Sequence, residues 1–363
     1  MTAMYYKVRH YQYKNRIGNL KSEAVGVVSG EKHFPIFPGN MIFKPLTKSK
    51  PFSTPLYAYA EVFWSTIINE YFMPAPRYEL AICEGYEAVN EKYLDYGTAV
   101  PMAYKEGESL LNLLEFFRKY PDEKVDIDNY VNYCQMFYDY RDIFEADFLQ
   151  EHQEMAEQLA MQVLISVLKG DQNYHYENVA FLCDKDGGII SLAPMIDHEF
   201  STYFMFPDDV SRHVYWLMEL SKSIRGWEVR PGEYDNFKDP EERKLMEKSA
   251  TCIHKNLLYI KEHYPQTTEE FLDKAEKLKT ALTEASEDFL IRGNTEYTDY
   301  ADSSAWLIGK ARYKDKDEEK ASAYEAELYG KGKKLDFRDV SISAINEIKA
   351  VISQMEEVLR KRE

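Results

Sequence analysis

The chain has 363 residues, of which 45% are hydrophobic and 29% are charged. This composition is typical of soluble globular proteins, and the length allows one large two-lobed domain or two ordinary domains with a substantial core. The formal net charge is −17. Nonspecific binding to nucleic acids or to anionic membranes requires a concentrated positive surface. We therefore expect no direct contact with nucleic acid and none with a membrane.

The cysteines indicate a reducing compartment. All four lie far apart in the sequence, and none forms a C-x-x-C pair. This pattern disfavours structural zinc and a disulfide framework. The N-terminal segment MTAMYYK has no apolar signal core, and no apolar run approaches membrane-spanning length. The sequence thus favours a cytoplasmic protein.

The pattern of residues 1–105 predicts several strands and one helix. Thr54 is suited to cap the helix and Pro55 to begin it, and Pro74 is expected to stop it. Strands are expected at 39–45, 77–83 and 97–104. The polar stretch 105–109 follows, so we place the boundary between two lobes after residue 105.

The second part, residues 106–363, has a mainly helical pattern. A long helical region is expected to begin with Leu110–Leu114, and a capping box at Thr267 and Glu270 predicts a second helix start. Helices are also expected at 152–169, 214–222, 249–263, 267–290 and 342–360. The last of these closes the chain as a helical extension, after a charged stretch of solvated helix or loop at 312–334.

A predicted β-hairpin interrupts the helical pattern within residues 170–200. Its arms are Val179–Cys183 and Ile189–Ala193, and the turn Asp-Lys-Asp-Gly-Gly supplies glycines that adopt positive φ without a Cβ clash. The hairpin would bring Asn178 and Asp197 together at its open end. A helix end, a polar loop, an Asn, a hairpin and an Asp in this order are typical of phosphoryl transfer, where the Asn and the Asp hold Mg²⁺.

A set of motifs, in this order and at these separations, carries a resemblance to a known family. They are Ile42-Phe43-Lys44-Pro45, a helix bearing Glu61, Pro74-x-Pro76, Gly107-Glu108-Ser109-Leu110, the loop Gly170–Asn178, and Leu192-Ala193-Pro194-Met195-Ile196-Asp197. Over roughly residues 35–205 the chain resembles the HipA-like kinase family. The resemblance implies a bilobal, protein-kinase-like α+β fold, with a smaller β-rich N-lobe that covers the nucleotide and a larger, mainly helical C-lobe. It also implies ATP and Mg²⁺ as cofactors and, as in some members, a protein serine or threonine hydroxyl as the acceptor.

The resemblance also implies roles for individual residues. Lys44 would contact the ATP phosphates with Glu61 as its helix-borne partner, because an ammonium in a low-dielectric cleft needs a carboxylate to fix its position. Asn178 and Asp197 would be the Mg²⁺ ligands, since a hard cation prefers oxygen donors. The alternatives are a surface lysine at a strand end, an Asx turn at Asn178, and an aspartate that accepts from local backbone donors.

The chain departs from the family at the catalytic base. The pattern G-x-x-D-x-H-x-x-N runs here from Gly170 to Asn178 with Asn173 in place of the aspartate. An amide takes up no proton near neutral pH, and general base catalysis is worth about 10²–10⁴-fold. Asp171 is either a substitute base or a cap of the preceding helix or turn. His175 is expected to organise the loop, with proton relay as the alternative.

The phosphate loop is a second departure, because the chain has no G-x-G-x-x-G motif. Ile17–Ser22 is the best candidate for a loop over the nucleotide. The glycines of this region also fit ordinary hairpin turns.

Three functions are compatible with these residues. The first is an ATP- and Mg²⁺-dependent protein kinase, with Asp171 in place of the usual base. The second is a pseudokinase that binds nucleotide or a partner protein, which Asn173 favours. The third is a metal-dependent hydrolase, which leaves the lysine and its glutamate partner without a role. The hydrolase would use Asp171, His175, Asp197 and His198.

Overall fold

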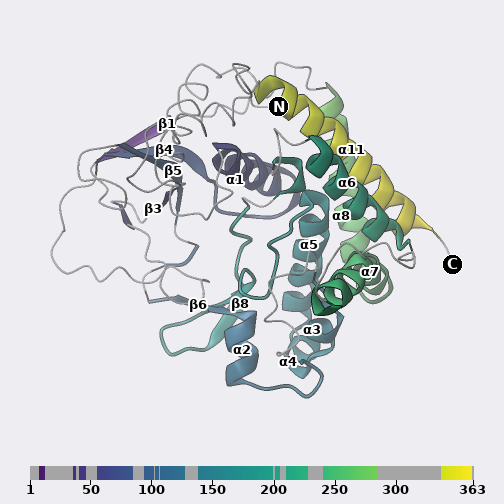
Figure 1. The fold of residues 1–363 in the computed structure, drawn as a ribbon. Coiled ribbons are helices and arrows are strands. Elements are labelled where there is room, and N and C mark those ends of the chain that lie inside the picture. The colour runs from purple at the N-terminus through teal and green to yellow at the C-terminus, as the bar shows by residue number, and fades with distance from the viewer. Residues whose placement is uncertain are drawn as a thin grey trace.

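The two parts of the sequence pattern form two lobes. A sheet with one helix lies on one side of the computed structural model, and the larger helical part lies on the other (Figure 1). The structure describes residues 8–12, 36–37, 41–45, 55–84, 94–101, 103–105, 107–126, 138–198, 201–204, 210–227, 240–284 and 337–361. The architecture is thus the expected bilobal α+β fold.

The small lobe is built on a five-stranded sheet in the order β1-β4-β5-β3-β2. Its strands are β1 (Val8–Gln12), β2 (Ile36–Phe37), β3 (Met41–Pro45), β4 (Glu79–Glu84) and β5 (Leu94–Pro101). β1 and β4 are parallel, and the other neighbours are antiparallel. β3 pairs with β5 so that Lys44 lies opposite Thr98, next to the end of its strand.

Helix α1 (Pro55–Ile67) joins the sheet to the large lobe and continues into a π-helical turn, η2 (Ile68–Phe72). It packs on β4 and β5 of the small lobe. From the same helix, Trp64 is fully buried and lies against Tyr203 of the large lobe, with ring centroids 6.0 Å apart. The helical segment ends before Pro74, as predicted.

The end of η2 is fixed to the large lobe through helix α8 (Pro265–Glu284). Lys274 Nζ donates to the carbonyl oxygen of Phe72 over 2.5 Å, and Phe72 stacks on Phe271 with ring centroids 5.5 Å apart. The segment that carries Glu61 therefore contacts both lobes.

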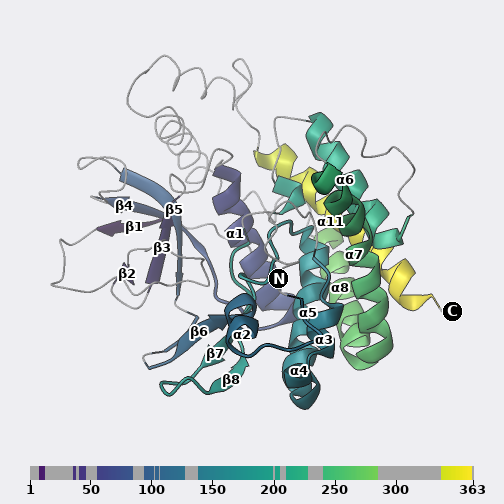
Figure 2. The ribbon, with the colours of Figure 1, turned by 60° about the horizontal axis from the view of Figure 1, so that its bottom comes forward.

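The large lobe surrounds helix α5 (Gln153–Lys169), as Figure 2 shows. Its residues from Leu159 to Lys169 are all buried. This explains why apolar residues occur on all sides of the helix, and not only on one face as in a surface helix. Helices α7 (Pro240–His263), α8 and α11 (Phe337–Arg360) pack against it. The remaining helical elements are α2 (Leu113–Lys119), α3 (Arg141–Glu145), α4 (Asp147–Glu151), the 3₁₀ turn η4 (Thr202–Phe204) and α6 (Val210–Arg225).

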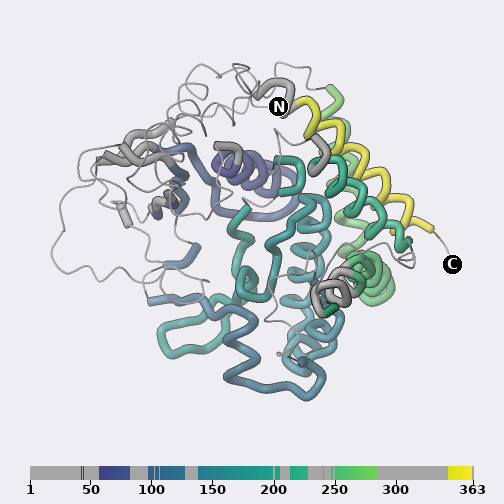
Figure 3. Tube along the Cα trace, in the orientation of Figure 1, coloured from purple at the N-terminus to yellow at the C-terminus, as the bar shows by residue number. Residues whose placement is uncertain are grey.

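A three-stranded sheet lies in the large lobe, with the order β6-β7-β8. The predicted hairpin is present as β7 (Ala180–Cys183) and β8 (Ile189–Leu192), and its path is visible in Figure 3. The expectation of helix at Leu110–Leu114 is wrong at its start, because Ser109–Asn112 is strand β6 and pairs with β7. Asn112 ends the strand and begins α2, since its side chain accepts from Glu115 N over 2.7 Å.

The predicted capping box is also wrong. Helix α8 begins at Pro265, directly after Tyr264, so Thr267 lies inside the helix and is buried. Proline at the first helical position already has the required φ and lacks only an N–H that would have no partner there. α11 likewise begins before the expected residue 342.

Two expectations, the candidate phosphate loop at 17–22 and the charged stretch at 312–334, lie outside the described residues. Within the described part of the chain, every helix is too short or too polar to span a bilayer.

Candidate active site

Lys44 joins three segments that are far apart in the sequence. Its Nζ lies 2.5 Å from Glu61 Oε1 on α1 and 2.5 Å from Asp197 Oδ1 after β8. The strand β3 supplies the lysine, the helix supplies the glutamate, and the hairpin supplies the aspartate. One ammonium thus connects the small lobe, its helix and the large lobe.

The two carboxylates of this cluster differ in their electrostatics. Burial raises the pKa of Glu61, and the charge of Lys44 opposes that shift without cancelling it. Burial also acts to raise the pKa of Asp197, but Lys44, with smaller contributions from Lys169 and His175, outweighs it, so the pKa falls below its ordinary value. The Glu61 side chain is 2% exposed and that of Asp197 is 25% exposed. Asp197 is therefore the ionised group that solvent reaches, and Glu61 anchors the lysine from behind.

Asp197 has an unusual backbone conformation, with φ of 61°. Aspartate is among the few residues other than glycine that visit this left-handed region with some frequency. Its backbone N–H donates to the hydroxyl of Tyr78 over 3.2 Å. Among the described residues, its second carboxylate oxygen, Oδ2, has no partner.

Gly170 ends α5 and begins the loop that leads to the hairpin. Its φ is 57°, and a Cβ here would lie 2.9 Å from Leu220 Cδ2 and 2.9 Å from Thr202 Oγ1. Its carbonyl oxygen accepts from the backbone N–H and from the hydroxyl of Thr202, over 3.1 and 2.7 Å. Glycine is thus needed here for two reasons. The backbone is left-handed, and the segment that follows Asp197 approaches too closely to leave room for a Cβ.

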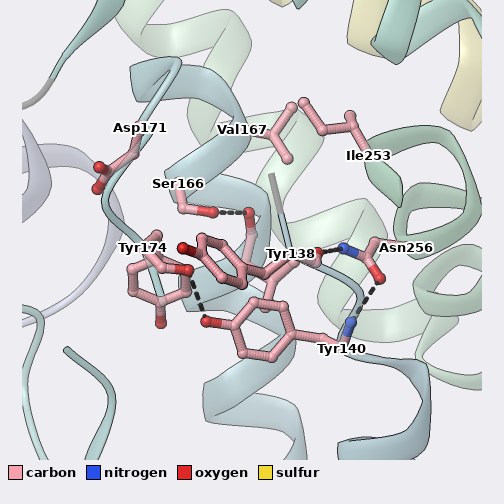
Figure 4. Close-up of a pocket in the computed structure, with 9 residues that line it drawn as sticks. Tyr138, Tyr140, Ser166, Val167, Asp171, Tyr174, Ile253 and Asn256 are labelled. Carbon is pink, nitrogen blue, oxygen red and sulfur yellow. Dashed lines mark hydrogen bonds between the residues drawn. The ribbon is translucent and has the colours of Figure 1, made fainter. Parts of the chain in front are cut away.

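Asp171 lies on the buried side of the loop. One carboxylate oxygen accepts from Asn173 N over 2.9 Å, and the other contacts Lys169 Nζ at 2.6 Å. Its side chain is only 1% exposed. A small cavity of about 20 Å³ adjoins it, lined by tyrosines that include Tyr140 and Tyr174 (Figure 4). The geometry fits the turn-capping alternative for Asp171 and leaves neither oxygen free for a substrate hydroxyl.

Asn173 and Asn178 are connected across the loop. The side-chain Nδ2 of Asn178 donates to the carbonyl oxygen of Asn173 over 2.6 Å. This bond uses the amide nitrogen and orients the amide oxygen, which is the atom suited to bind a cation. The hairpin then places Asn178 and Asp197 at the same end, because Ala193 N donates to Ala180 O over 2.8 Å.

His175 contributes to the internal order of the loop. Its carbonyl oxygen accepts from Asn178 N over 2.8 Å, and its Nδ1 accepts from Glu177 N over 3.2 Å. Burial lowers its pKa, although the charges of Glu177, Asp197 and Asp171 oppose the shift. A neutral imidazole whose Nδ1 is engaged carries its proton on Nε2, so neither nitrogen is free to take a proton from a hydroxyl.

The sequence patterns predicted no role for Lys169, and they gave His198 a role only in the hydrolase hypothesis. Lys169 Nζ lies 3.0 Å from Nδ1 of His198, and both side chains are fully buried. The His198 backbone N–H donates to Glu61 Oε2 over 2.9 Å. The available signal was a lysine at the end of an apolar run, Leu-Ile-Ser-Val-Leu-Lys, in a helix that is buried all round.

The hydrolase reading finds no support in this geometry. Asp171 and His198, which a hydrolase would use as metal ligands, both contact the ammonium of Lys169 instead. This ammonium occupies the position between them that a metal ion would need. The part of the chain that the structure describes contains no group of three or more His, Cys, Asp or Glu residues arranged to hold a metal ion.

Comparisons with known proteins add little. No protein-family model matches the chain, and no curated protein matches it. One similar solved structure is the Helicobacter pylori proinflammatory kinase CtkA, with 15% sequence identity and a TM-score of 0.37, over 75% of this chain and 95% of that one. The order of the elements makes the present chain a bilobal α+β fold, in which Lys44 contacts Glu61 and Asp197.

Proposed function

We propose that the chain is an ATP- and Mg²⁺-dependent kinase of the HipA-like type, which phosphorylates a serine or threonine hydroxyl of a protein. The observation that carries this proposal is the position of Lys44 Nζ, 2.5 Å from both Glu61 and Asp197. A lysine on a sheet strand, paired with a helix glutamate and next to a metal-loop aspartate, is the constellation that kinases use to hold nucleotide phosphates.

The residues present fit Mg²⁺ and the phosphates of ATP. Asp197 Oδ2 is free of partners among the described residues, and the amide oxygen of Asn178 is oriented by the bond from Nδ2 to Asn173. Oxygen donors of this kind suit Mg²⁺, which supplies charge neutralisation for the transferred phosphoryl group. The Lys44 side chain is 19% exposed, so solvent reaches part of it. Glu61 holds its ammonium in place.

The loop supplies no carboxylate base at the acceptor position. Asn173 replaces the aspartate, and Asp171 is engaged by Lys169 and by Asn173 N. Phosphoryl transfer has a loose transition state, so alignment and charge neutralisation provide much of the acceleration. We therefore infer slow transfer to the acceptor, lower by about 10²–10⁴-fold than with an aspartate.

The first test is a thermal shift with MgATP. MgATP is expected to raise the melting temperature, because a ligand that binds only the folded state stabilises it. Asp197→Asn is expected to remove most of this rise, since it deletes the charge that faces Mg²⁺. Asp186→Asn, in the exposed turn of the hairpin, is the matched control and should leave the rise intact. The absence of any rise with the wild-type protein would refute the nucleotide site.

Transfer is then measured with labelled ATP, either to the protein itself or to proteins of a cell extract. Lys44→Met is expected to abolish labelling while the melting temperature still reports a folded protein. Labelling that persists in Lys44→Met would contradict the assignment of this lysine.

The second candidate is a pseudokinase that binds nucleotide or a protein partner without efficient transfer. The loss of the base at Asn173 and the engagement of Asp171 favour it. A rise in melting temperature with MgATP but no labelling, even with Mg²⁺ and ATP in excess, would distinguish it from the kinase.

A further inference from the structure

Lys169 is a fully buried lysine that the proposed transfer chemistry does not use. It is the last residue of α5, and its side chain is 0% exposed. An ammonium inside a protein costs free energy unless it is paired and hydrogen-bonded. Lys169 Nζ meets this requirement with Asp171 Oδ2 at 2.6 Å and His198 Nδ1 at 3.0 Å. The two partners belong to different loops, one before the hairpin and one after it.

On one side, Lys169 is connected to the loop before the hairpin. The carboxylate of Asp171 that it holds also accepts from Asn173 N over 2.9 Å. The carbonyl oxygen of Asn173 in turn accepts from Asn178 Nδ2 over 2.6 Å. The orientation of the proposed ligand Asn178 thus depends on a turn whose carboxylate is fixed by Lys169.

On the other side, Lys169 is connected to the loop after the hairpin. Nδ1 of His198 is an acceptor here, because an ammonium only donates. The backbone N–H of the same His198 donates to Glu61 Oε2 over 2.9 Å, and Glu61 holds Lys44. His198 directly follows the proposed ligand Asp197. The position of the second ligand is therefore coupled to the same ammonium.

The backbone of Lys169 is fixed independently of its side chain. Its carbonyl oxygen accepts from Ser201 Oγ over 2.8 Å, and Ser201 Oγ accepts from Trp64 Nε1 on α1 over 2.9 Å. A rigid backbone at the end of a buried helix gives the ammonium a defined direction.

We propose that Lys169 is a positioning residue that sets the relative placement of the two Mg²⁺-binding loops, through simultaneous contact with Asp171 and His198. The inference rests on the proposed function for its consequence, since the loops carry the proposed ligands Asn178 and Asp197. Loss of the ammonium would leave each loop folded and the bonds from Ser201 and Thr202 to the end of α5 in place. It would remove the side-chain link between Asp171 and His198.

The test separates this role from a purely stabilising one. Lys169→Met leaves the Asp171 carboxylate buried without a cation, so the melting temperature falls. The double variant Lys169→Met with Asp171→Asn removes that charge and keeps an oxygen acceptor for Asn173 N, so most of the lost melting temperature returns. If the single variant does not fold, the double variant alone decides.

Hydrogen exchange of the ligand-free protein is the primary measurement. In the double variant, amide exchange is expected to be roughly tenfold faster than in the wild type both at 171–178 and at 195–198. The rise in melting temperature with MgATP should also be smaller than in the wild type. Lys279→Met, which breaks the 3.0 Å ion pair with Glu356 between α8 and α11, is the control and should leave exchange in both loops unchanged.

Wild-type exchange in both loops of a folded double variant, or faster exchange in only one of them, would overturn the role of Lys169. A wild-type protein that shows no response to MgATP would instead overturn the proposed function. The exchange measurement still decides whether Lys169 couples the loops in that case, so the two failures are distinguishable.

Discussion

At the scale of single residues, exposure distinguishes the charged groups that solvent reaches from the buried groups that support them. Lys44 and Asp197 are partly exposed, whereas Glu61, Asp171 and Lys169 are buried. The sequence indicated the first pair and Glu61 through their order along the chain. The apolar run before Lys169 was a signal of burial, but its contacts with Asp171 and His198 could not be predicted, because a lysine next to a helix-ending glycine is normally a solvated helix terminus.

The assignment of Asn173 to the base position predicts a gain of activity. Asn173→Asp is expected to raise the rate of phosphoryl transfer by about 10²–10⁴-fold, because a carboxylate accepts the hydroxyl proton where an amide does not. The bond from Asn178 Nδ2 uses the backbone carbonyl of residue 173 and survives the substitution. The measurement is the initial rate of labelling from ATP.

Asn173→Ala serves as the control for Asn173→Asp, since it changes the same side chain without adding a carboxylate. The rate of phosphoryl transfer in Asn173→Ala should stay close to the slow rate of the wild type. No gain with Asp, in a variant that still responds to MgATP, would show that residue 173 does not face the acceptor.

At the scale of elements, the hairpin and α5 could be predicted because their signals are local. The Asp-Gly-Gly turn forms as expected, with a φ of 83° at Gly187. In addition, Asp184 Oδ1 accepts from the backbone N–H groups of Asp186 and Gly188 over 2.9 and 2.8 Å. Strand β6 could not be predicted, because Leu110 and its neighbours suit a helix equally well. Only pairing with β7, which lies far away in the sequence, makes Ser109–Asn112 a strand.

The junction between α5 and the following loop predicts a difference between two glycines with positive φ. Gly170→Ala is expected to destabilise by more than the ~1–2 kcal/mol of a left-handed residue, because the new Cβ would also overlap Leu220 and Thr202. Gly187→Ala has a φ of 83° with no atom within 4 Å of the new Cβ, so it should show only the conformational cost. Urea unfolding of both variants gives the two free energies.

The response to MgATP provides a second readout for this pair. Gly170→Ala should weaken it, because Gly170 O bonds to Thr202, which lies shortly after Asp197. Equal destabilisation of the two variants would contradict the close approach at Gly170.

At the scale of the whole molecule, buried histidines couple folding to pH. Burial lowers the pKa of His175, and burial together with the charges of Lys169 and Lys44 lowers that of His198 well below its ordinary value. Below the ordinary value of 6.5, the unfolded chain binds protons that the folded chain does not. The free energy of unfolding therefore keeps its full value above pH 6.5. It decreases as the pH falls toward the pKa values of the two histidines in the folded protein.

A fall from about pH 7.5 to about pH 5.5 is therefore expected to lower the free energy of unfolding by up to about 1.4 kcal/mol for each of these histidines, the limit set by protonation of the unfolded chain. His198→Asn keeps an oxygen acceptor near Lys169 but removes one titrating group, so its stability should depend less on pH over this window. Urea unfolding at the two pH values measures the slope. An identical slope in His198→Asn and wild type would contradict the neutral, buried state of His198.

The attachment of η2 to α8 limits how α1 can move relative to the large lobe. Lys274 bonds to Phe72 at one end of the helical segment, and Trp64 is held by Ser201 in its middle. An outward swing of α1, which would withdraw Glu61 from Lys44, has to break both contacts. Admission of a bulky ligand is therefore expected to come from displacement of the sheet relative to α1, with β3 carrying Lys44 away from a stationary glutamate.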